Sequence, residues 1–261
     1  MINQPIIVES IPIFKDNYIW LLFNSEKDKV IAVDPGDGSK LIDYLTFNRI
    51  TLEAILITHH HHDHIGGINA LIQRYDVNVY GPQNERIEGV THPVAEGHCI
   101  EFPFLKSPCQ ILDIPGHTLG HIAYLLPGIL FCGDTLFSAG CGRLFEGSAE
   151  QMYYSLQKIA SLPGDTKLYC THEYTLENLQ FAKHVEPNNE AILKKIEQVS
   201  ALRKENKPSL PTTINEELQI NPFLRCHLKE IGLNAQRYVG AKLNGPIEVF
   251  QALRAWKDVS S

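Results

Sequence analysis

One polar segment, Thr-His-His-His-His-Asp-His at residues 58–64, constrains this chain more than any other part of it. It directly follows the apolar run 54–57, and an apolar run bounded by polar residues predicts a buried strand. Ligands of open α/β folds bind where strands end, so the histidines stand at a suitable place. Side chains alternate along an extended chain, so His59 and His61 should point the same way. The segment predicts a metal site, with two ligands for each of two neighbouring ions. These candidates are His59, His61, Asp63 and His64.

The other two histidines of the segment, His60 and His62, alternate to the opposite side and are expected to be spacers. An expression tag or a polar surface patch is the other simple explanation for a histidine-rich tract. A tag would be terminal and uninterrupted. This tract is internal, is broken by Asp63 and runs into residues 65–67, which fit the start of a helix. The metal interpretation is therefore favoured.

The overall composition is ordinary for a soluble globular protein, with 44% hydrophobic and 20% charged residues. The 261 residues suffice for one large domain or for a domain with a smaller partner. No apolar run is long enough to span a membrane, and the net charge of −7 argues against binding to nucleic acid or anionic membranes. The first positive residue is Lys15, so the start of the chain lacks the charged segment of a signal peptide, and the six cysteines lack a C-x-x-C pair. We therefore expect a cytoplasmic protein with free thiols. A monomer is the default expectation.

Short apolar runs and amphipathic stretches alternate up to about residue 173. Strands are expected at 6–8, 18–23 and 30–33, a helix at 65–75, and a second helix at 148–162 that begins at Ser148. Later helices are expected at 175–184, 189–205 and 246–257, with a loop at 206–211. We expect an α/β catalytic domain over residues 1–173 and a helical domain over residues 174–261.

Three more polar residues follow apolar runs or stand in tight turns. His117 lies in a Pro-Gly-His-Thr turn, Asp134 follows the run 129–131, and His172 follows the short strand expected at 167–170. Each alone is weak evidence, because glycine followed by a polar residue is usual turn chemistry. Together with the histidine tract they complete a set of seven candidate ligands, and that combination is specific.

The series T-H-x-H-x-D-H, G-H-T, G-D-T and T-H resembles the motifs of the metallo-β-lactamase superfamily. The whole chain, including residues 140–147, 171–175 and 221–225, is similar to the hydroxyacylglutathione hydrolase (glyoxalase II) family. This resemblance implies an α/β fold, a four-layer αβ/βα sandwich of two packed sheets with helices outside. It also implies a helical, substrate-binding C-terminal domain.

The resemblance also implies a ligand assignment. The first metal ion would be held by His59, His61 and His117, and the second by Asp63, His64 and His172, with Asp134 bridging both. Because the donors are imidazoles and carboxylates, zinc is the first expectation for both divalent ions, and iron or manganese fit as well. Asp34 matches an aspartate that supports the ligands from behind, although a simple turn former explains it equally well. His121 is implied to be a non-ligand neighbour, and Cys132 is expected to be a buried thiol.

The implied activity is hydrolysis of a glutathione thioester. Two divalent ions about 3.5–4 Å apart can share a water and lower its pKa toward ~7. The resulting hydroxide, held through Asp63 and Asp134, would attack the thioester carbonyl, and a thiolate leaves readily. The expected substrate is S-(2-hydroxyacyl)glutathione such as S-D-lactoylglutathione. It would yield glutathione and D-lactate, the second step of methylglyoxal detoxification.

Substrate-binding residues follow from the same resemblance. They are Arg143, Tyr174, Arg254 and Lys257. Arg254 and Lys257 are spaced i, i+3 and share a helix face, although a solvated helix end would also favour basic residues. Arg143 stands where some members have lysine, and it can still bind a carboxylate. Phe145 stands where others have tyrosine, and it cannot donate a hydroxyl hydrogen bond.

Three other functions remain open at this stage. The metals could serve a different substrate, such as a lactone, a β-lactam, a phosphodiester or another thioester. A persulfide oxidase would hold one iron, which the full second ligand set disfavours. A structural or storage zinc site would be closed and often rich in thiolates, unlike this donor set. Deleting the helical tail should impair glutathione-thioester turnover far more than turnover of small esters.

Overall fold

The computed structural model describes residues 6–105 and 107–260, and they divide into two compact units. Unit 1 runs to Asp113 and resumes over Leu119–Gly133. Unit 2 comprises Ile114–Thr118 and the chain from Asp134 onward. This division follows compactness alone, and the domain boundary expected after residue 173 stays a prediction.

A six-stranded sheet with the order β1-β2-β3-β4-β5-β6 forms most of unit 1. Its strands are β1 Ile7–Ile13, β2 Asn17–Phe23, β3 Lys29–Val33, β4 Thr51–Leu56, β5 Asn78–Pro82 and β6 His92–Val94. The first three pair antiparallel, and β3 to β6 pair parallel. Val33 pairs with Leu56 at the carboxyl ends of β3 and β4. The segments that follow these two strands, Asp34 and the histidine tract, therefore leave the same edge of the sheet.

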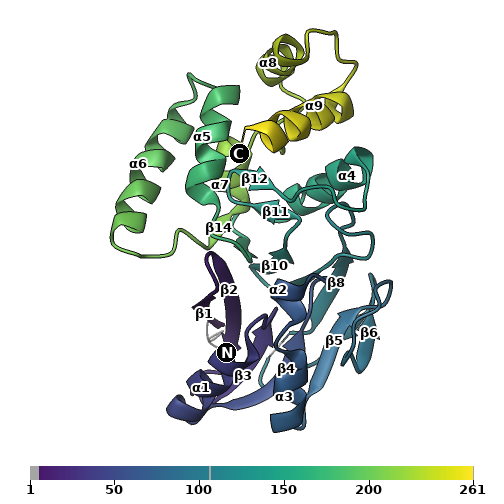
Figure 1. Ribbon diagram of the computed structural model, residues 1–261, viewed down its shortest axis with the longest axis vertical. Helices are drawn as coiled ribbons and strands as arrows, with labels where there is room; N and C mark the ends of the chain where they lie inside the picture. Colours follow the sequence, from purple (N-terminus) through teal and green to yellow (C-terminus); the bar gives the residue numbers. More distant parts are fainter. Residues whose placement is uncertain (1–5, 106, 261) are drawn as a thin grey trace. The chain divides into compact units, whose positions relative to one another are not determined.

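Helices α1 (Gly38–Asn48) and α3 (Ile68–Arg74) pack on this sheet (Figure 1). Leu41 and Leu45 of α1 share one buried core with Ile68 of α3 and with strand residues such as Ile55. The short helix α2 (His62–Ile65) precedes α3.

The prediction of a single helix over residues 65–75 was wrong at its start, because Gly66 and Gly67 separate α2 from α3. A Cβ atom at Gly67 would lie 2.1 Å from the carbonyl oxygen of Pro35. Only glycine permits this approach.

An antiparallel meander completes unit 1. Its strands are β7 Cys99–Ile100, β8 Cys109–Asp113, β9 Ile122–Leu126 and β10 Ile129–Gly133. Tyr124 of β9 is fully buried, and its hydroxyl donates to the carbonyl oxygen of Ile57 at 2.8 Å. Burial raises the pKa of Tyr124 well above its ordinary value. The meander is thus tied to the segment that leads into the histidine tract.

Unit 2 contains short strands and most of the helices. Its strands are β11 Leu136–Phe137, β12 Gly140–Cys141, β13 Lys167–Cys170 and β14 Thr212–Thr213. Its helices are α4 Ala149–Ala160, α5 Thr175–Val185, α6 Glu190–Lys204, α7 Ile214–Ile220, α8 Lys229–Val239 and α9 Pro246–Val259. Ser148 begins α4 as expected, and it forms a reciprocal capping box with Gln151. The expected helices agree with α4, α5, α6 and α9 to within about two residues. The helices α7 and α8 were not expected.

A buried carboxylate holds part of unit 2 together. Glu217 of α7 is fully buried and accepts hydrogen bonds from Ser138 Oγ at 2.9 Å and Ala139 N at 2.7 Å. Thr212 Oγ1 and Asn221 Nδ2 also donate to it, at 2.8 and 3.0 Å. Burial nevertheless raises the pKa of this carboxyl. Glu217 therefore fastens the turn between β11 and β12 to α7.

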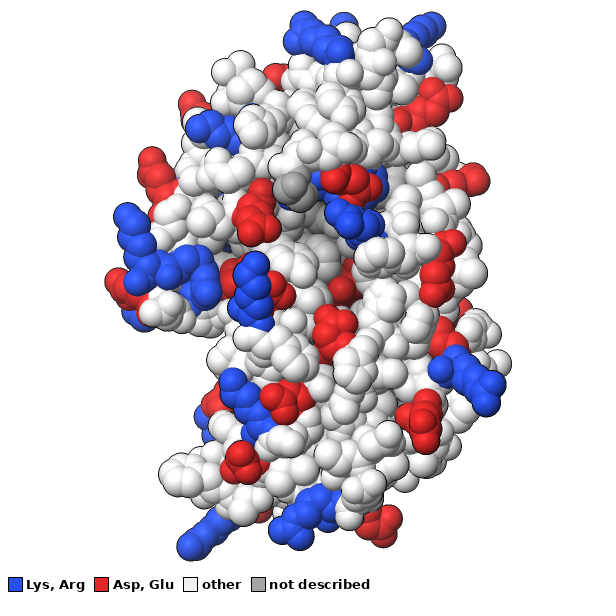
Figure 2. Space-filling view, viewed as in Figure 1, with Lys and Arg blue, Asp and Glu red and all other residues white. Residues whose placement is uncertain are grey.

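Acidic and basic side chains are interspersed on the face shown in Figure 2. Such mixing, together with the net charge of −7, is unlike the basic stripe of a protein that binds nucleic acid. Among the described residues, no helix combines the length and apolar composition that crossing a membrane requires.

Candidate metal centre

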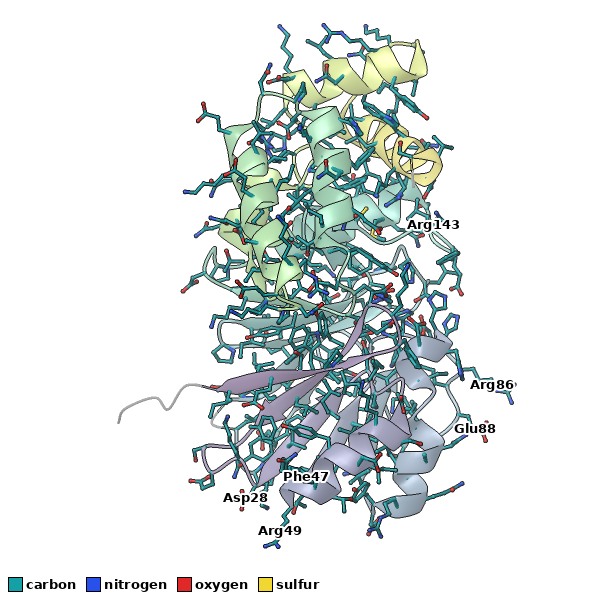
Figure 3. The ribbon with its side chains drawn as sticks, turned by 60° about the vertical axis from the view of Figure 1, so that its left-hand side comes forward. Asp28, Phe47, Arg49, Arg86, Glu88 and Arg143 are labelled. Atoms are coloured by element: carbon teal, nitrogen blue, oxygen red, sulfur yellow. The ribbon has the colours of Figure 1, made fainter. Side chains whose placement is uncertain are left out.

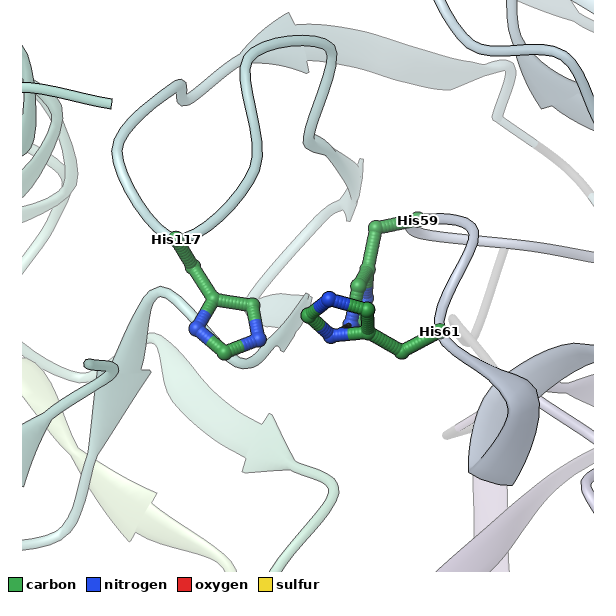
Figure 4. Close-up of side chains that lie close together, drawn as sticks. All are labelled: His59, His61 and His117. Carbon is green, nitrogen blue, oxygen red and sulfur yellow. Dashed lines mark hydrogen bonds between the residues drawn. The ribbon is translucent and has the colours of Figure 1, made fainter. Parts of the chain in front are cut away.

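Two histidines leave the end of β4 side by side. The Nε2 atom of His59 lies 3.0 Å from Nδ1 of His61, and Figure 4 draws both rings. His59 is fully buried, and its Nδ1 lies 3.1 Å from the hydroxyl of Thr58. His60 points elsewhere, since its Nδ1 lies 3.0 Å from a carboxylate oxygen of Glu85. The alternation predicted from the sequence is therefore present for these three residues.

Asp63 and His64 stand on α2, the helix that follows directly. The Nε2 atom of His64 lies 3.5 Å from Oδ2 of Asp63. Potential ligand atoms of His64 also lie within 4.8 Å of one in His59. Asn17 of β2 donates from Nδ2 to Asp63 Oδ2 at 2.8 Å. Unit 1 thus gathers its four candidate ligands on one short stretch of chain.

Asp34 supports this stretch from behind. Its carboxylate accepts from the backbone N of Thr58 at 2.8 Å and from the Thr58 hydroxyl at 2.7 Å. Its Oδ2 also lies 3.0 Å from Nδ1 of His64. The carboxylate orients the imidazole and leaves Nε2 as the ligand atom. Asp34 also forms a turn, because its carbonyl accepts from the N of Gly36 at 2.9 Å. Both interpretations of this residue hold.

Unit 2 gathers the other three candidate ligands around one carboxylate. The Oδ2 atom of Asp134 lies 3.6 Å from Nε2 of His117 and 3.2 Å from Nε2 of His172. All three residues are at most 6% exposed. One carboxylate oxygen therefore lies against two imidazole nitrogens from separate loops.

The loops that carry these residues are built on close backbone contacts. His117, also drawn in Figure 4, follows Gly116. Gly116 has φ 151°, and a Cβ atom at this position would lie 2.7 Å from Cβ of Met152. At Gly142 a Cβ would lie 1.9 Å from the carbonyl oxygen of Asp134. His117 Nδ1 lies 2.8 Å from the carbonyl oxygen of Arg143, an acceptor that requires Nδ1 to carry the proton. That tautomer leaves His117 Nε2 free of hydrogen and directed at Asp134.

The expected substrate-binding residues all lie in unit 2. Tyr174 stacks on the ring of His172, with centroids 4.6 Å apart and planes 7° from parallel. Phe145 is 61% exposed and lies edge-on to His117, with ring centroids 5.2 Å apart. Arg143 stands on the loop after β12, and Arg254 and Lys257 stand on α9.

Arg254 differs from an ordinary surface cation. It is 6% exposed, and its Nη1 donates to the carbonyl oxygen of Cys141 at 2.9 Å. Burial, and then the charge of Arg254, lower the pKa of Lys257. Burial also raises the pKa of the Cys141 thiol to about 11, although Arg254 opposes this shift. The two cations of α9 therefore lie in partly desolvated surroundings.

Two contacts in the site had no signal in the sequence. Asn17 is 46 positions from Asp63, and Asp258, which binds Arg254, is 115 positions from its second partner, Arg143. Asn17 belongs to no motif or periodic pattern. Asp258 has the i,i+4 spacing of a helical ion pair with Arg254, but nothing in the sequence indicates its contact with Arg143.

Nitrogen and oxygen donors characterise both sets of candidate ligands. Unit 1 supplies three imidazoles and one carboxylate, and unit 2 supplies two imidazoles and one carboxylate. Such donors suit divalent ions such as zinc, iron and manganese. The buried cysteines do not enter either set, and Cys132, as expected, is buried in β10.

Comparison with known proteins identifies the family. A model of the metallo-beta-lactamase superfamily matches residues 14–97 and 111–172, and a model of the hydroxyacylglutathione hydrolase C-terminus matches residues 173–260. Hydroxyacylglutathione hydrolase from Nitrosomonas europaea is 48% identical over 94% of this chain and 93% of its own. The enzyme of the same name from Shewanella pealeana is 50% identical over 94% of this chain and 96% of its own.

Solved structures agree on the fold. The crystal structure of ETHE1 from Myxococcus xanthus has a TM-score of 0.66 at 24% identity, covering 98% of this chain and 100% of that one. The BLEG-1 B3 metallo-beta-lactamase has a TM-score of 0.63 at 23% identity, covering 84% of this chain and 99% of that one. The expected metallo-β-lactamase fold with a helical C-terminal domain is thereby confirmed. The chain belongs to the hydroxyacylglutathione hydrolase family of the metallo-β-lactamase superfamily.

Proposed function

We propose that this chain hydrolyses S-(2-hydroxyacyl)glutathione thioesters at a centre of two divalent metal ions. Membership of a family whose relatives are named for this substrate supports the activity. The observation that carries the metal centre is the position of Asp134, whose one oxygen faces Nε2 of both His117 and His172. A carboxylate in that position is suited to bridging two cations.

The proposed ligand sets divide the seven donors between the two ions. His59, His61 and His117 would hold the first ion, and Asp63, His64 and His172 would hold the second, with Asp134 shared. The donors fit such ions, because they are imidazole and carboxylate groups, and five of the seven are buried. Asp34 behind His64 and the Arg143 carbonyl behind His117 fix two of the rings for coordination.

The chemistry needs an activated water and a stabilised oxyanion. Two divalent ions held by these residues would supply both, because bound cations lower the pKa of a water and polarise a thioester carbonyl. The protein holds its own groups in place for this step: Asn17 fixes the carboxylate of Asp63, and Tyr174 packs flat against His172. The thiolate that leaves has an ordinary pKa near 8.5, so the reaction needs no dedicated acid.

The substrate carries two carboxylates, and a chain of net charge −7 must meet them with local cations. The proposed anchors are Arg143, Tyr174, Arg254 and Lys257, of which Arg254 is buried and Arg143 is about half exposed. S-D-lactoylglutathione is the proposed natural substrate. Zinc is proposed as the native ion, and a monomer in the cytoplasm as the native state. The six free cysteines support a reducing compartment.

Asp134→Asn tests this function. We expect hydrolysis of S-D-lactoylglutathione to fall by more than about 100-fold, because the variant loses a charged ligand shared by both ions. Circular dichroism and thermal unfolding should show an intact fold. Asp165→Asn removes an exposed aspartate just before β13 and serves as the matched control. Full activity in Asp134→Asn would refute the bridging role.

A further inference from the structure

One carboxylate near the end of α9 joins two arginines of unit 2. Asp258 Oδ1 accepts from Nε of Arg143 at 3.1 Å and from Nη2 of Arg254 at 3.0 Å. Arg143 and Asp258 are 115 positions apart, so this bridge connects the loop after β12 to the last helix. A bridge of this kind determines where the guanidinium of Arg143 lies.

The two arginines are held very differently. Arg254 has a side chain that is 8% exposed, it donates to the carbonyl oxygen of Cys141, and its guanidinium lies 5.4 Å from the ring centre of Phe223. Arg143 has a side chain that is 52% exposed and stands at the surface (Figure 3). Arg254 is therefore held in place by its surroundings, and Asp258 links the exposed Arg143 to it through hydrogen bonds.

We propose that Asp258 is a positioning residue that pre-orders Arg143 for a substrate carboxylate. This inference rests on the proposed function, since it assigns Asp258 a part in binding the glutathione portion of the thioester. The contact with Asp258 uses Nε of Arg143, which leaves Nη1 and Nη2 as donors for a ligand. An arginine already held in place does not lose rotamer freedom when the ligand binds.

The negative charge of Asp258 opposes its effect on the position of Arg143. It repels an anionic ligand, and loss of that repulsion favours binding. The side chain of Asp258 is 34% exposed, however, and charge interactions at such a site are screened by water and salt. The local charge also stays positive, because the three cations Arg143, Arg254 and Lys257 outnumber Asp258 and Glu177, the two carboxylates that act on Lys257. Ordering therefore outweighs repulsion, and Asp258 strengthens binding.

The test compares Asp258→Asn with the wild type in the metal-loaded protein. S-hexylglutathione, a thioether that cannot be hydrolysed, serves as the binding probe in calorimetry. We expect its Kd to rise about 2- to 10-fold, the range set by freeing one long side chain. The KM for S-D-lactoylglutathione should rise by the same factor at unchanged kcat. Hydrolysis of an uncharged aryl acetate should not change, and Asp258→Glu should restore part of the loss. Asp165→Asn, which removes the same charge elsewhere in unit 2, should leave every value unchanged.

A double-mutant cycle shows whether Asp258 acts through Arg143. Arg143→Ala alone should weaken S-hexylglutathione binding, and adding Asp258→Asn to that variant should have little further effect. Equal effects of Asp258→Asn with and without Arg143 would overturn the proposal.

Other outcomes separate the bridge from the function. If Asp258→Asn bound the probe as tightly as the wild type, or more tightly, the bridge would be refuted while the proposed function stood. If Asp258→Asn hydrolysed the glutathione thioester and the aryl acetate more slowly by the same factor and had a lower Tm, Asp258 would have only a structural role. A metal-loaded wild type that neither bound the probe nor cleaved the thioester would refute the proposed function and the bridge with it.

Discussion

The backbone conformation and the side chain of Asp34 both help to orient His64. Its φ of 50° lies in the left-handed region, which aspartate tolerates better than most residues do. In this conformation the buried carboxylate reaches both Thr58 and His64. The local structure of β3's end is thus tied to the orientation of a candidate ligand on α2.

Asp34→Asn should weaken the centre without unfolding the protein. Asparagine also tolerates a positive φ, but it offers one oxygen and no charge to the groups that the carboxylate now holds. Metal affinity or hydrolysis rate should fall about 10- to 100-fold, as is typical when a group behind a ligand is lost, and metal content per chain should fall with the affinity. Asp43→Asn, at an exposed position of α1 in the same unit, should match the wild type. Unchanged metal retention in Asp34→Asn would show that His64 does not depend on this contact.

At this scale the sequence predicted residues that belong to motifs. The alternation in the histidine tract indicated that His59 and His61 share a direction, and the chain folds that way. The contacts of Asn17 with Asp63 and of Asp258 with Arg143 were missed because a contact between distant positions leaves no periodic or local trace. The i,i+4 spacing of Arg254 and Asp258 was a local signal that was not used. The joint coordination of two ions by all seven donors stays a prediction.

Among the elements, α7 is held by a polar contact rather than by apolar packing alone. Glu217 accepts four hydrogen bonds, yet its burial penalises the charged form and raises its pKa. The folded state therefore binds a proton at Glu217 more tightly than the unfolded chain does. The contribution of this group to stability grows as pH falls from its raised folded pKa toward 4.5 and is lost as pH rises.

Glu217→Gln should destabilise the protein by about 1–3 kcal/mol, because the amide nitrogen cannot accept the hydrogen bonds that now reach one carboxylate oxygen. The difference in unfolding free energy between wild type and variant should widen as pH is lowered from 8 toward about 5. Urea unfolding across this range measures it, with the exposed Glu197→Gln of α6 as control. A difference that shrinks toward low pH would contradict the raised pKa.

The sequence predicted α4, α5, α6 and α9 closely and missed α7 and α8. Helix α4 has a capping box, and α9 begins with Pro246 at a favourable first-turn position. Helix α7 has only seven residues, which is too short for a long apolar stripe. Helix α8 was missed although its apolar residues gather on one face, where Ile231 and Ala235 are buried. The break between α2 and α3 depends on the approach of Gly67 to Pro35, a contact between segments that sequence periodicity does not report.

For the whole molecule, the order of motifs along the chain predicted the superfamily fold and the family, because each motif fixes a loop at the end of a particular strand. Composition predicted much less, since 44% hydrophobic residues and a charge of −7 describe many proteins. We propose that the choice of substrate depends on the helical tail and on contacts such as the one between Asp258 and Arg143. Those contacts arise only in the folded chain.

The most direct test of the account is the hydrolysis of S-D-lactoylglutathione by the purified protein, with metal content per chain measured on the same sample. Loss of thioester absorbance follows the reaction. The account predicts rapid turnover with about two divalent ions bound per chain. Two bound ions without turnover would contradict the assigned substrate, and turnover that survives complete removal of metal would contradict the mechanism.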